Sequence, residues 1–184
     1  MIKKWKLLSS KDVSPSAWFP IENRVYELPN GKIIDDFTVT TIGDVSMVVP
    51  LTKEGKIVLV RQYKPGVDEI TIEFPAGRIE ERHKDFKELA QHELEEETGI
   101  HSENLEEFAV VAGFVTKGSE RIHFFLARDV EFNSTQKFDP TEEIEVLQYT
   151  PAEFEAMIKE GKILGSQTIA GWALAKLKYP TLFS

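Results

Sequence analysis

The segment 85–97 has the strongest helical pattern in the chain, and strand-like runs lie on both sides of it. Asp85 and Glu88 have the spacing of a capping box, in which side chains satisfy the first free backbone N–H groups of a helix. An apolar stripe recurs at every fourth residue, as on one face of an amphipathic helix: Phe86, Ala90 and Leu94. Thr98-Gly99 supplies a stop signal, because glycine readily adopts the left-handed conformation that ends a helix. We therefore expect one well-defined helix in the middle of a β-rich chain.

Strands and two further helices are expected around this helix. Runs of apolar or alternating residues predict six strands: 45–51, 56–63, 69–74, 108–111, 121–130 and 144–149. Pro151–Glu160 begins with proline and ends before glycine, and Ser166–Lys178 begins with a capping serine, so both segments are predicted to be helices. A chain that mixes strands and helices in this order favours an α/β sandwich over a helical bundle or a β-barrel.

The first 44 residues are expected to form a separate small β unit, and residues 45–184 the main domain. Pro29-Asn30-Gly31 lies between two strand-like runs, 24–28 and 32–41. Asn-Gly is favoured in tight hairpin turns because both residues tolerate positive φ. The pattern therefore predicts a β-hairpin near the N-terminus.

The composition excludes several kinds of protein. With no cysteine among its 184 residues, the chain cannot form disulfides, zinc–thiolate sites or cysteine nucleophiles. A net charge of −9 argues against a general nucleic-acid or anionic-membrane binder, because such proteins need a basic surface. The sequence has neither an apolar run long enough to span a membrane nor a signal-peptide pattern near its N-terminus. A soluble, cytoplasmic protein is therefore expected.

Three glutamates near the end of the central helix form a candidate ligand set for a cation. Glu93 and Glu97 lie one turn apart, and Glu96 lies beside them. Carboxylate oxygens favour hard cations such as Mg²⁺, Mn²⁺ or Ca²⁺. The alternative is an ordinary solvated helix face, which is the usual setting of such an acidic run. Acidic residues at a helix C-terminus oppose the helix dipole at a cost of roughly 0.3–1 kcal/mol each, and a bound cation would remove that conflict.

A family resemblance lies in residues 77–100, GRIEERHKDFKELAQHELEEETGI, which are similar to a Nudix box. The pattern of that box is G-x5-E-x7-R-E-U-x-E-E-x-G-U, where U is an aliphatic residue. The matching positions are Gly77, Glu93, Leu94, Glu96, Glu97, Gly99 and Ile100. Flanking segments resemble the ADP-ribose pyrophosphatase branch of this family: VRQY (60–63), EFPAG (73–77), GSER (118–121) and the segment 157–175. The resemblance extends over roughly residues 20–178.

The box departs from the family pattern at its supporting positions. Gly77 and Gly99 are 22 positions apart, one more than the pattern has. The arginine of the pattern is His92 here, and its first glutamate falls at His83 or Lys84, depending on where the insertion is placed. In the family that arginine mainly holds the loop and the helix together, whereas the last three glutamates do most of the metal binding. The resemblance therefore implies the expected ligands on an altered scaffold, and it leaves the efficiency of turnover open.

The resemblance implies a site for Mg²⁺ or Mn²⁺ on the central helix. Glu93 and Glu97 are implied to be direct ligands. Glu96 is implied to be a further ligand or a partner of a ligand, and it is also an implied catalytic residue. The backbone carbonyl of Ala76 is an implied ligand, because a small residue at this position lets the backbone approach the metal. The alternative for Pro75-Ala76-Gly77 is an ordinary turn that ends a strand.

Glu120 is the implied general base, because it matches the glutamate of the SER triplet that activates water in bacterial ADP-ribose pyrophosphatases. A carboxylate is a sufficient base near neutral pH when a metal acidifies the attacking water. Glycines around Glu120 predict a mobile loop, as a base that closes over substrate needs. The alternative is a loop carboxylate paired with Lys117 or Arg121.

Six residues are candidates for substrate contacts: Arg61, Arg78 and Arg121 for phosphate or ribose, Glu73 for a hydroxyl group, and Trp18 and Phe19 for the nucleobase. Arginine binds phosphate through paired hydrogen bonds, and an aromatic ring stacks on any base. In this branch the N-terminal aromatic often comes from the partner subunit, which implies a homodimer. The alternatives are surface ion pairs for the arginines, a solvent-facing strand position for the glutamate, and anchoring of the hairpin for the aromatics.

The resemblance implies a Nudix α/β/α sandwich with a mixed sheet and a small N-terminal β-hairpin unit. The implied activity is divalent-metal-dependent hydrolysis of the pyrophosphate bond in ADP-ribose or a related nucleoside diphosphate sugar. Its products are a nucleoside monophosphate and a sugar phosphate. Two alternatives stay open: a catalytically weak or inactive Nudix-like domain that binds a nucleotide as a sensor or regulator, and a scaffold without chemistry.

Overall fold

The structure, a computed structural model, describes residues 1–138 and 141–183, and the chain folds as two compact units. The first unit contains Met1–Asp44 and Ala112–Arg121, and the second contains Val45–Val111 and Ile122–Ser184. The division expected from the sequence, after residue 44, did not place 112–121 with the first unit. No helix in the described part of the chain is both long and apolar enough to cross a membrane.

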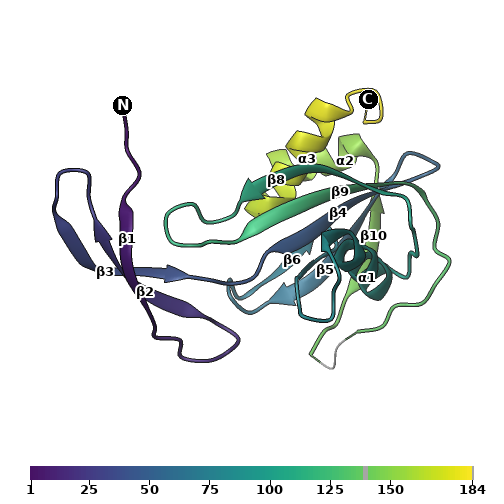
Figure 1. Ribbon diagram of the computed structural model, residues 1–184. Helices are drawn as coiled ribbons and strands as arrows, with labels where there is room; N and C mark the ends of the chain where they lie inside the picture. The colour runs from purple at the N-terminus through teal and green to yellow at the C-terminus, as the bar shows by residue number, and fades with distance from the viewer. Residues whose placement is uncertain (139–140, 184) are drawn as a thin grey trace. The chain divides into compact units, whose positions relative to one another are not determined.

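The first unit is built on a three-stranded antiparallel sheet (Figure 1). Its strands, in spatial order, are β1 (Lys6–Asp12), β2 (Ile21–Glu27) and β3 (Ile33–Thr40). The predicted hairpin is β2–β3, whose turn contains Gly31 at a φ of 83°. β1 was not expected, because all of its residues are exposed and no apolar alternation marks it. Three rings pack edge to face in this unit with centroids 5.6 to 5.8 Å apart: Trp5, Tyr26 and Phe37.

The second unit is built on a mixed sheet of seven strands (Figure 1). They are β4 (Val45–Thr52), β5 (Ile57–Lys64), β6 (Glu69–Glu73), β7 (Ala76–Arg78), β8 (Leu105–Ala112), β9 (Arg121–Val130) and β10 (Glu145–Tyr149). The main path runs β10-β5-β4-β9-β8, while β6 pairs with β5 and β7 pairs with β4. β4 and β9 are parallel, whereas β5 is antiparallel to β4, β6 and β10. The short strand β7 stands where the sequence suggested only a turn.

Helices cover both faces of this sheet (Figure 1): α1 (Phe86–Thr98), α2 (Pro151–Lys159) and α3 (Ser166–Lys178). One core cluster lies on the α1 face and another on the α2–α3 face. The alternation of side chains along β4 explains this division, because Met47 and Val49 enter the α2–α3 core and Val48 enters the α1 core. The predicted α/β/α sandwich with a mixed sheet is therefore confirmed.

The start of α1 follows the expected capping signals in part, because Asp85 caps the helix but the Glu88 carboxylate bonds to the Lys84 N–H and not to the Asp85 N–H. The Asp85 carboxylate accepts a hydrogen bond from the Glu88 N–H at 2.8 Å, and the Glu88 carboxylate accepts one from the Lys84 N–H. These bonds satisfy donors that the first turn of any helix leaves free. Gly99 ends the helix in the left-handed conformation, with a φ of 73°.

The acidic C-terminal turn of α1 is covered by the segment 134–137. The Lys137 N–H donates to the Glu96 carbonyl at 3.0 Å, and the Gln136 side-chain amide donates to the Glu97 carbonyl at 2.7 Å. These donors satisfy carbonyls that the end of the helix leaves free. These N–H donors also offset the negative end of the helix dipole, which the acidic side chains oppose. No cation is therefore needed at the free carbonyls for this purpose.

Candidate functional site

Two glutamates of α1 are drawn into the interior beside β7. Glu97 is only 4% exposed, and its Oε2 accepts a hydrogen bond from the Ala76 N–H at 3.1 Å. The Glu93 carboxylate lies against Gly77, where any Cβ would overlap it. Because residues four apart share a helix face, both carboxylates point at the same short strand. The structure thus brings together Glu93, Glu97 and Ala76, three of the four metal ligands that the resemblance implied.

Burial makes these two carboxylates costly to ionise. It raises the pKa of Glu93 to about 7, and the negative charges of Glu96 and Glu142 add to the shift. Burial also raises the pKa of Glu97 to about 8, with the Glu93 charge adding to the shift and Lys64 opposing it. Buried carboxylates are normally protonated unless they are paired with a cation or coordinate a metal. The electrostatics of this site therefore suit a divalent cation.

The oxygen donors around β7 also suit a hard cation in their chemistry. Mg²⁺ accepts carboxylate and carbonyl oxygens and usually keeps several water ligands. Within residues 1–138 and 141–183, no group of three or more His, Asp or Glu side chains is placed to hold a metal ion. A cation held by Glu93 and Glu97 would therefore complete its coordination with a backbone oxygen and with water. The Ala76 carbonyl is the expected backbone ligand.

Glu96 differs from its two neighbours in the ligand set. Its side chain is 36% exposed, and its Oε1 lies 3.9 Å from Nη1 of Arg82 in the loop before α1. Successive helix residues are about 100° apart around the axis, so Glu96 does not share the face that carries Glu97. The structure places Glu96 at the edge of the site, and its metal-binding and catalytic roles stay predictions.

The charge of a fourth carboxylate, Glu142, acts on this site, although the sequence did not point to it. Its charge raises the pKa of both Glu93 and Glu97. Glu142 also lines a cleft of about 490 Å³ together with Tyr63 and Lys64. It lies ahead of β10, far along the chain from α1, and only the tertiary structure brings it close. No local spacing in the sequence could have identified it.

Glu120 lies in the first unit, in the loop between β8 and β9. Its carboxylate occupies the space beside Gly113 and Gly118, and its Oε2 is buried without a hydrogen-bond partner among the described residues. The structure does not show the alternative, an ion pair of Glu120 with Lys117 or Arg121. Lys117 lies over an aromatic ring, and the Arg121 guanidinium donates to backbone carbonyls at 3.4 Å. The role of Glu120 as general base stays a prediction.

The polar substrate candidates of the second unit lie on neighbouring strands. The Arg61 guanidinium pairs with the Glu145 carboxylate, which is the surface ion pair considered as its alternative role. Oε2 of Glu73 lies 3.6 Å from Nζ of Lys64. Arg78 is half-buried on β7, next to the strand residues that contact Glu93 and Glu97. Their contacts with substrate stay predictions.

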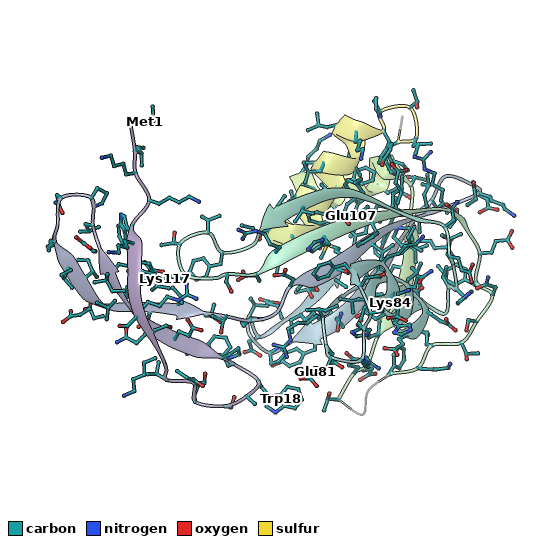
Figure 2. The ribbon with its side chains drawn as sticks, viewed as in Figure 1. Met1, Trp18, Glu81, Lys84, Glu107 and Lys117 are labelled. Atoms are coloured by element: carbon teal, nitrogen blue, oxygen red, sulfur yellow. The ribbon has the colours of Figure 1, made fainter. Side chains whose placement is uncertain are left out.

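The remaining substrate candidates belong to the first unit. Trp18 is 78% exposed and Phe19 is 47% exposed. Figure 2 shows the Trp18 side chain at the loop between β1 and β2. The Arg121 backbone N–H donates to the Asp44 carboxylate at 2.7 Å, which fixes the start of β9. The stacking role of both rings stays a prediction.

Comparison with known families identifies the chain. A family profile described as NUDIX domain matches residues 42–166, which is most of the sequence. The chain belongs to the Nudix family. This Nudix protein is 35% identical over 147 residues to a methanol dehydrogenase activator from Bacillus methanolicus, covering 78% of this chain and 77% of that protein. It is 30% identical over 155 residues to an ADP-ribose pyrophosphatase from Bacillus subtilis, with 83% and 82% covered.

Solved structures agree with the fold of this Nudix protein. A crystal structure of an ADP compounds hydrolase superposes with a TM-score of 0.84 and 19% sequence identity, covering 98% of this chain and 96% of that one. At that identity the similarity establishes the fold alone. Together with the family match and the pyrophosphatase relative, it confirms the predicted assignment as a Nudix hydrolase.

Proposed function

We propose that this Nudix hydrolase cleaves the pyrophosphate bond of ADP-ribose or a related nucleoside diphosphate sugar, with Mg²⁺ or Mn²⁺ as cofactor. The products are a nucleoside monophosphate and a sugar phosphate. The observation that carries the proposal is the pair of buried carboxylates, Glu93 and Glu97, held against Ala76 and Gly77. An acidic site binds a diphosphate only when cations offset the charge. The ADP-ribose pyrophosphatase relative supports the substrate class.

The residues around β7 have distinct roles in this proposal. Glu93, Glu97 and the Ala76 carbonyl would hold the cation, with Glu96 as a further ligand. A divalent cation supplies charge neutralisation of the diphosphate and Lewis-acid activation at phosphorus. Gly77 leaves room for the Glu93 carboxylate beside the backbone, which a larger residue would displace.

The reaction also needs a group that takes a proton from the attacking water. The water oxygen forms a bond to one phosphorus, the bond from that phosphorus to the bridging oxygen breaks, and a carboxylate accepts the proton. Glu120 is the base expected from the sequence. Glu142 is a second candidate, because its charge acts on both Glu93 and Glu97.

Matched glutamine variants separate these two candidates for the base. Replacing a general base lowers kcat by about 10²-fold or more without weakening metal binding. We expect that loss in one of the variants, Glu120→Gln or Glu142→Gln, and Mn²⁺ affinity close to wild type in the same variant. Two variants that both keep the wild-type kcat would exclude both residues as the base.

Substrate contacts are proposed for cationic and aromatic side chains. In the second unit Lys64 is well placed, because it lowers the pKa of Glu97 and lies 3.6 Å from the Glu73 carboxylate. Arg78, Arg121 and Arg61 are the other proposed phosphate or ribose contacts, and Glu73 the proposed hydroxyl contact. The exposed rings of Trp18 and Phe19 are proposed to stack on the nucleobase.

The first unit is proposed to form a homodimer. β1 exposes Leu7 and Leu8, which are 49% and 44% exposed, and the nearby Trp5 is 45% exposed. Apolar groups gathered in this way favour burial against a partner. Light scattering on the eluting protein should give twice the mass of one chain. A single-chain mass at assay concentration would refute the dimer and leave the enzymatic proposal intact.

A direct assay tests the proposed activity. The protein is incubated with ADP-ribose and a panel of nucleoside diphosphate sugars, with Mg²⁺ or Mn²⁺, and release of the monophosphate is measured. Glu97→Gln should abolish turnover, whereas Glu95→Gln, on the same helix, should retain it because Glu95 bonds to Ser134 and His101 instead. Activity unchanged in Glu97→Gln would refute the metal site. Ligand binding without turnover of any substrate would refute the proposed enzymatic activity.

A second candidate function is regulation of another enzyme. The relative from Bacillus methanolicus is named for activation of methanol dehydrogenase, and it is 35% identical to this chain. The altered Nudix box also fits a protein that binds nucleotides and turns them over slowly. The test is methanol dehydrogenase turnover with and without this protein, using Glu97→Gln in parallel. Stimulation that survives in Glu97→Gln would favour a regulator that does not depend on hydrolysis.

A further inference from the structure

The loop between β7 and α1 contains a compact turn at residues 80–83; Figure 2 labels Glu81 within this turn and Lys84 directly after it. The His83 N–H donates to the Glu80 carbonyl at 3.0 Å and closes the turn. The Glu80 N–H donates in return to Nδ1 of His83 at 3.2 Å. The histidine side chain is thereby fixed over its own turn. Because Nδ1 is an acceptor, the neutral ring carries its proton on Nε2.

The His83 ring is buried where the turn meets α1. The residue is 8% exposed, and its Nε2 has no hydrogen-bond partner within the described residues. Burial and the nearby Arg82 charge lower the pKa of His83, so the ring is neutral near neutral pH. The ring of His92 on α1 lies against it, with centroids 5.3 Å apart and planes tilted by 55°. A ring fixed by its own turn and packed on a second ring joins the turn to the helix.

This contact lies next to the proposed metal site along the chain. His92 directly precedes Glu93, whose carboxylate rests against Gly77 on β7. From Gly77 the chain passes through the turn 80–83 and returns to α1 at Phe86. The turn therefore closes a short loop between the strand and the helix that meet at Glu93. Movement of the turn away from α1 would loosen the position of this glutamate.

We propose that the contact between His83 and His92 positions Glu93 for cation binding by holding the turn 80–83 on α1. The inference rests on the proposed metal site. Both histidines are positioning residues, since neither is proposed to touch substrate or metal. Another tie between the turn and the helix is the pair Arg82 and Glu96, at 3.9 Å and with side chains 54% and 36% exposed. Solvent screening makes such an exposed pair the weaker tie.

The proposal accounts for the departures from the Nudix box. His92 stands where the family pattern has an arginine, and the first glutamate of the pattern falls at His83 or Lys84. The structure shows that His83 and His92 contact each other, so that two histidine rings are in contact at this junction. On this reasoning the two substitutions form one functional unit and should be tested together.

Mn²⁺ binding to the substrate-free protein tests the proposal. Electron paramagnetic resonance measures the affinity of wild type, His83→Ala, His92→Ala and the double variant. Each single variant should weaken binding by about tenfold, the lower end of the effect of losing a residue that supports a metal ligand. The double variant should be no weaker than either single, because all three lose the same contact. His92→Phe keeps a ring against His83 and should bind Mn²⁺ nearly as well as wild type.

Amide hydrogen exchange in metal-free protein tests the same contact without a cation. The amides of residues 79–84 should exchange faster in His92→Ala than in wild type or His92→Phe. Losses of Mn²⁺ affinity that multiply in the double variant would overturn the proposal, as would single variants that are less stable but bind Mn²⁺ normally. Wild-type protein that binds no Mn²⁺ would refute the metal site instead. Exchange of residues 79–84 then decides the inference, and equal protection in wild type and His92→Ala overturns it.

Discussion

The burial of Glu97 predicts that the metal-free protein loses stability as the pH rises from 6 to 8. In the folded state burial raises its pKa to about 8, whereas in an unfolded chain the glutamate has its ordinary pKa of 4.5. The folded state therefore binds more protons between these values, and the free energy of unfolding falls with increasing pH. The contribution of Glu97 is fully present below the unfolded pKa and is lost as the pH rises through about 8.

The size of this effect follows from the shift. One pKa unit corresponds to about 1.4 kcal/mol, so titration of Glu97 between pH 6 and 8 removes about 2 kcal/mol. For a chain of 184 residues this lowers the unfolding temperature by about 4–8 °C. Scanning calorimetry in EDTA at pH 6, 7 and 8 measures the change. Other titrating groups contribute to the raw slope, so the comparison is made with a variant.

Glu97→Gln is the matched variant, because it removes the charge and keeps an oxygen that can accept from the Ala76 N–H. It should show a smaller pH slope than wild type and a higher unfolding temperature at pH 8 without metal. Mg²⁺ at pH 8 should stabilise wild type, by about 2.7 kcal/mol at 100 times its Kd, and should not stabilise the variant. Equal pH slopes for the two proteins in EDTA would refute the argument from burial.

Three substitutions of residues whose side chains are not metal ligands test the packing and the proposed base stacking. Gly77→Ala should fold but lose cation binding and turnover by about tenfold or more, because its methyl group displaces the glutamate carboxylate that rests there, whereas Gly66→Ala meets open space and should behave as wild type. Gly171→Ala should be destabilised by about 1–3 kcal/mol in denaturant titration, because the new methyl group meets the buried ring of Phe124. Trp18→Ala should raise the KM for ADP-ribose by about tenfold or more and leave kcat unchanged if the ring stacks on the base.

Elements with strong local signals were predictable from the sequence. The cap, apolar stripe and terminal glycine of α1 placed it to within one residue at each end, and the Asn-Gly turn placed the β2–β3 hairpin. β1 could not be found in this way, because its exposed residues carry no apolar period. β7 was not predicted for a different reason. It has three residues and exists through its pairing with β4, which is a property of the tertiary structure.

The site was predictable where one helix determines it and not where separate segments meet. The spacing of Glu93 and Glu97 was sufficient to place both on one face, and β7 lies opposite them. The contact of Glu96 with Arg82 could not be predicted in this way, because it depends on the path of the loop before α1. Glu142 joins the site from a distant segment through its charge on the two buried carboxylates. Such long-range electrostatic coupling leaves no periodic trace in a sequence.

The burial of Glu97 argues against an ordinary solvated acidic face on this part of α1. A solvated face would expose its carboxylates and leave their pKa values low, whereas Glu97 is 4% exposed and its pKa is raised to about 8. Without a cation, this arrangement costs stability at neutral pH. Proteins tolerate such a cost mainly at functional sites, where activity requires groups that the fold alone would not favour. The Glu97→Gln variant should be more stable than wild type without metal and should no longer bind the cation. That result would show that one buried carboxylate lowers stability and is needed for cation binding.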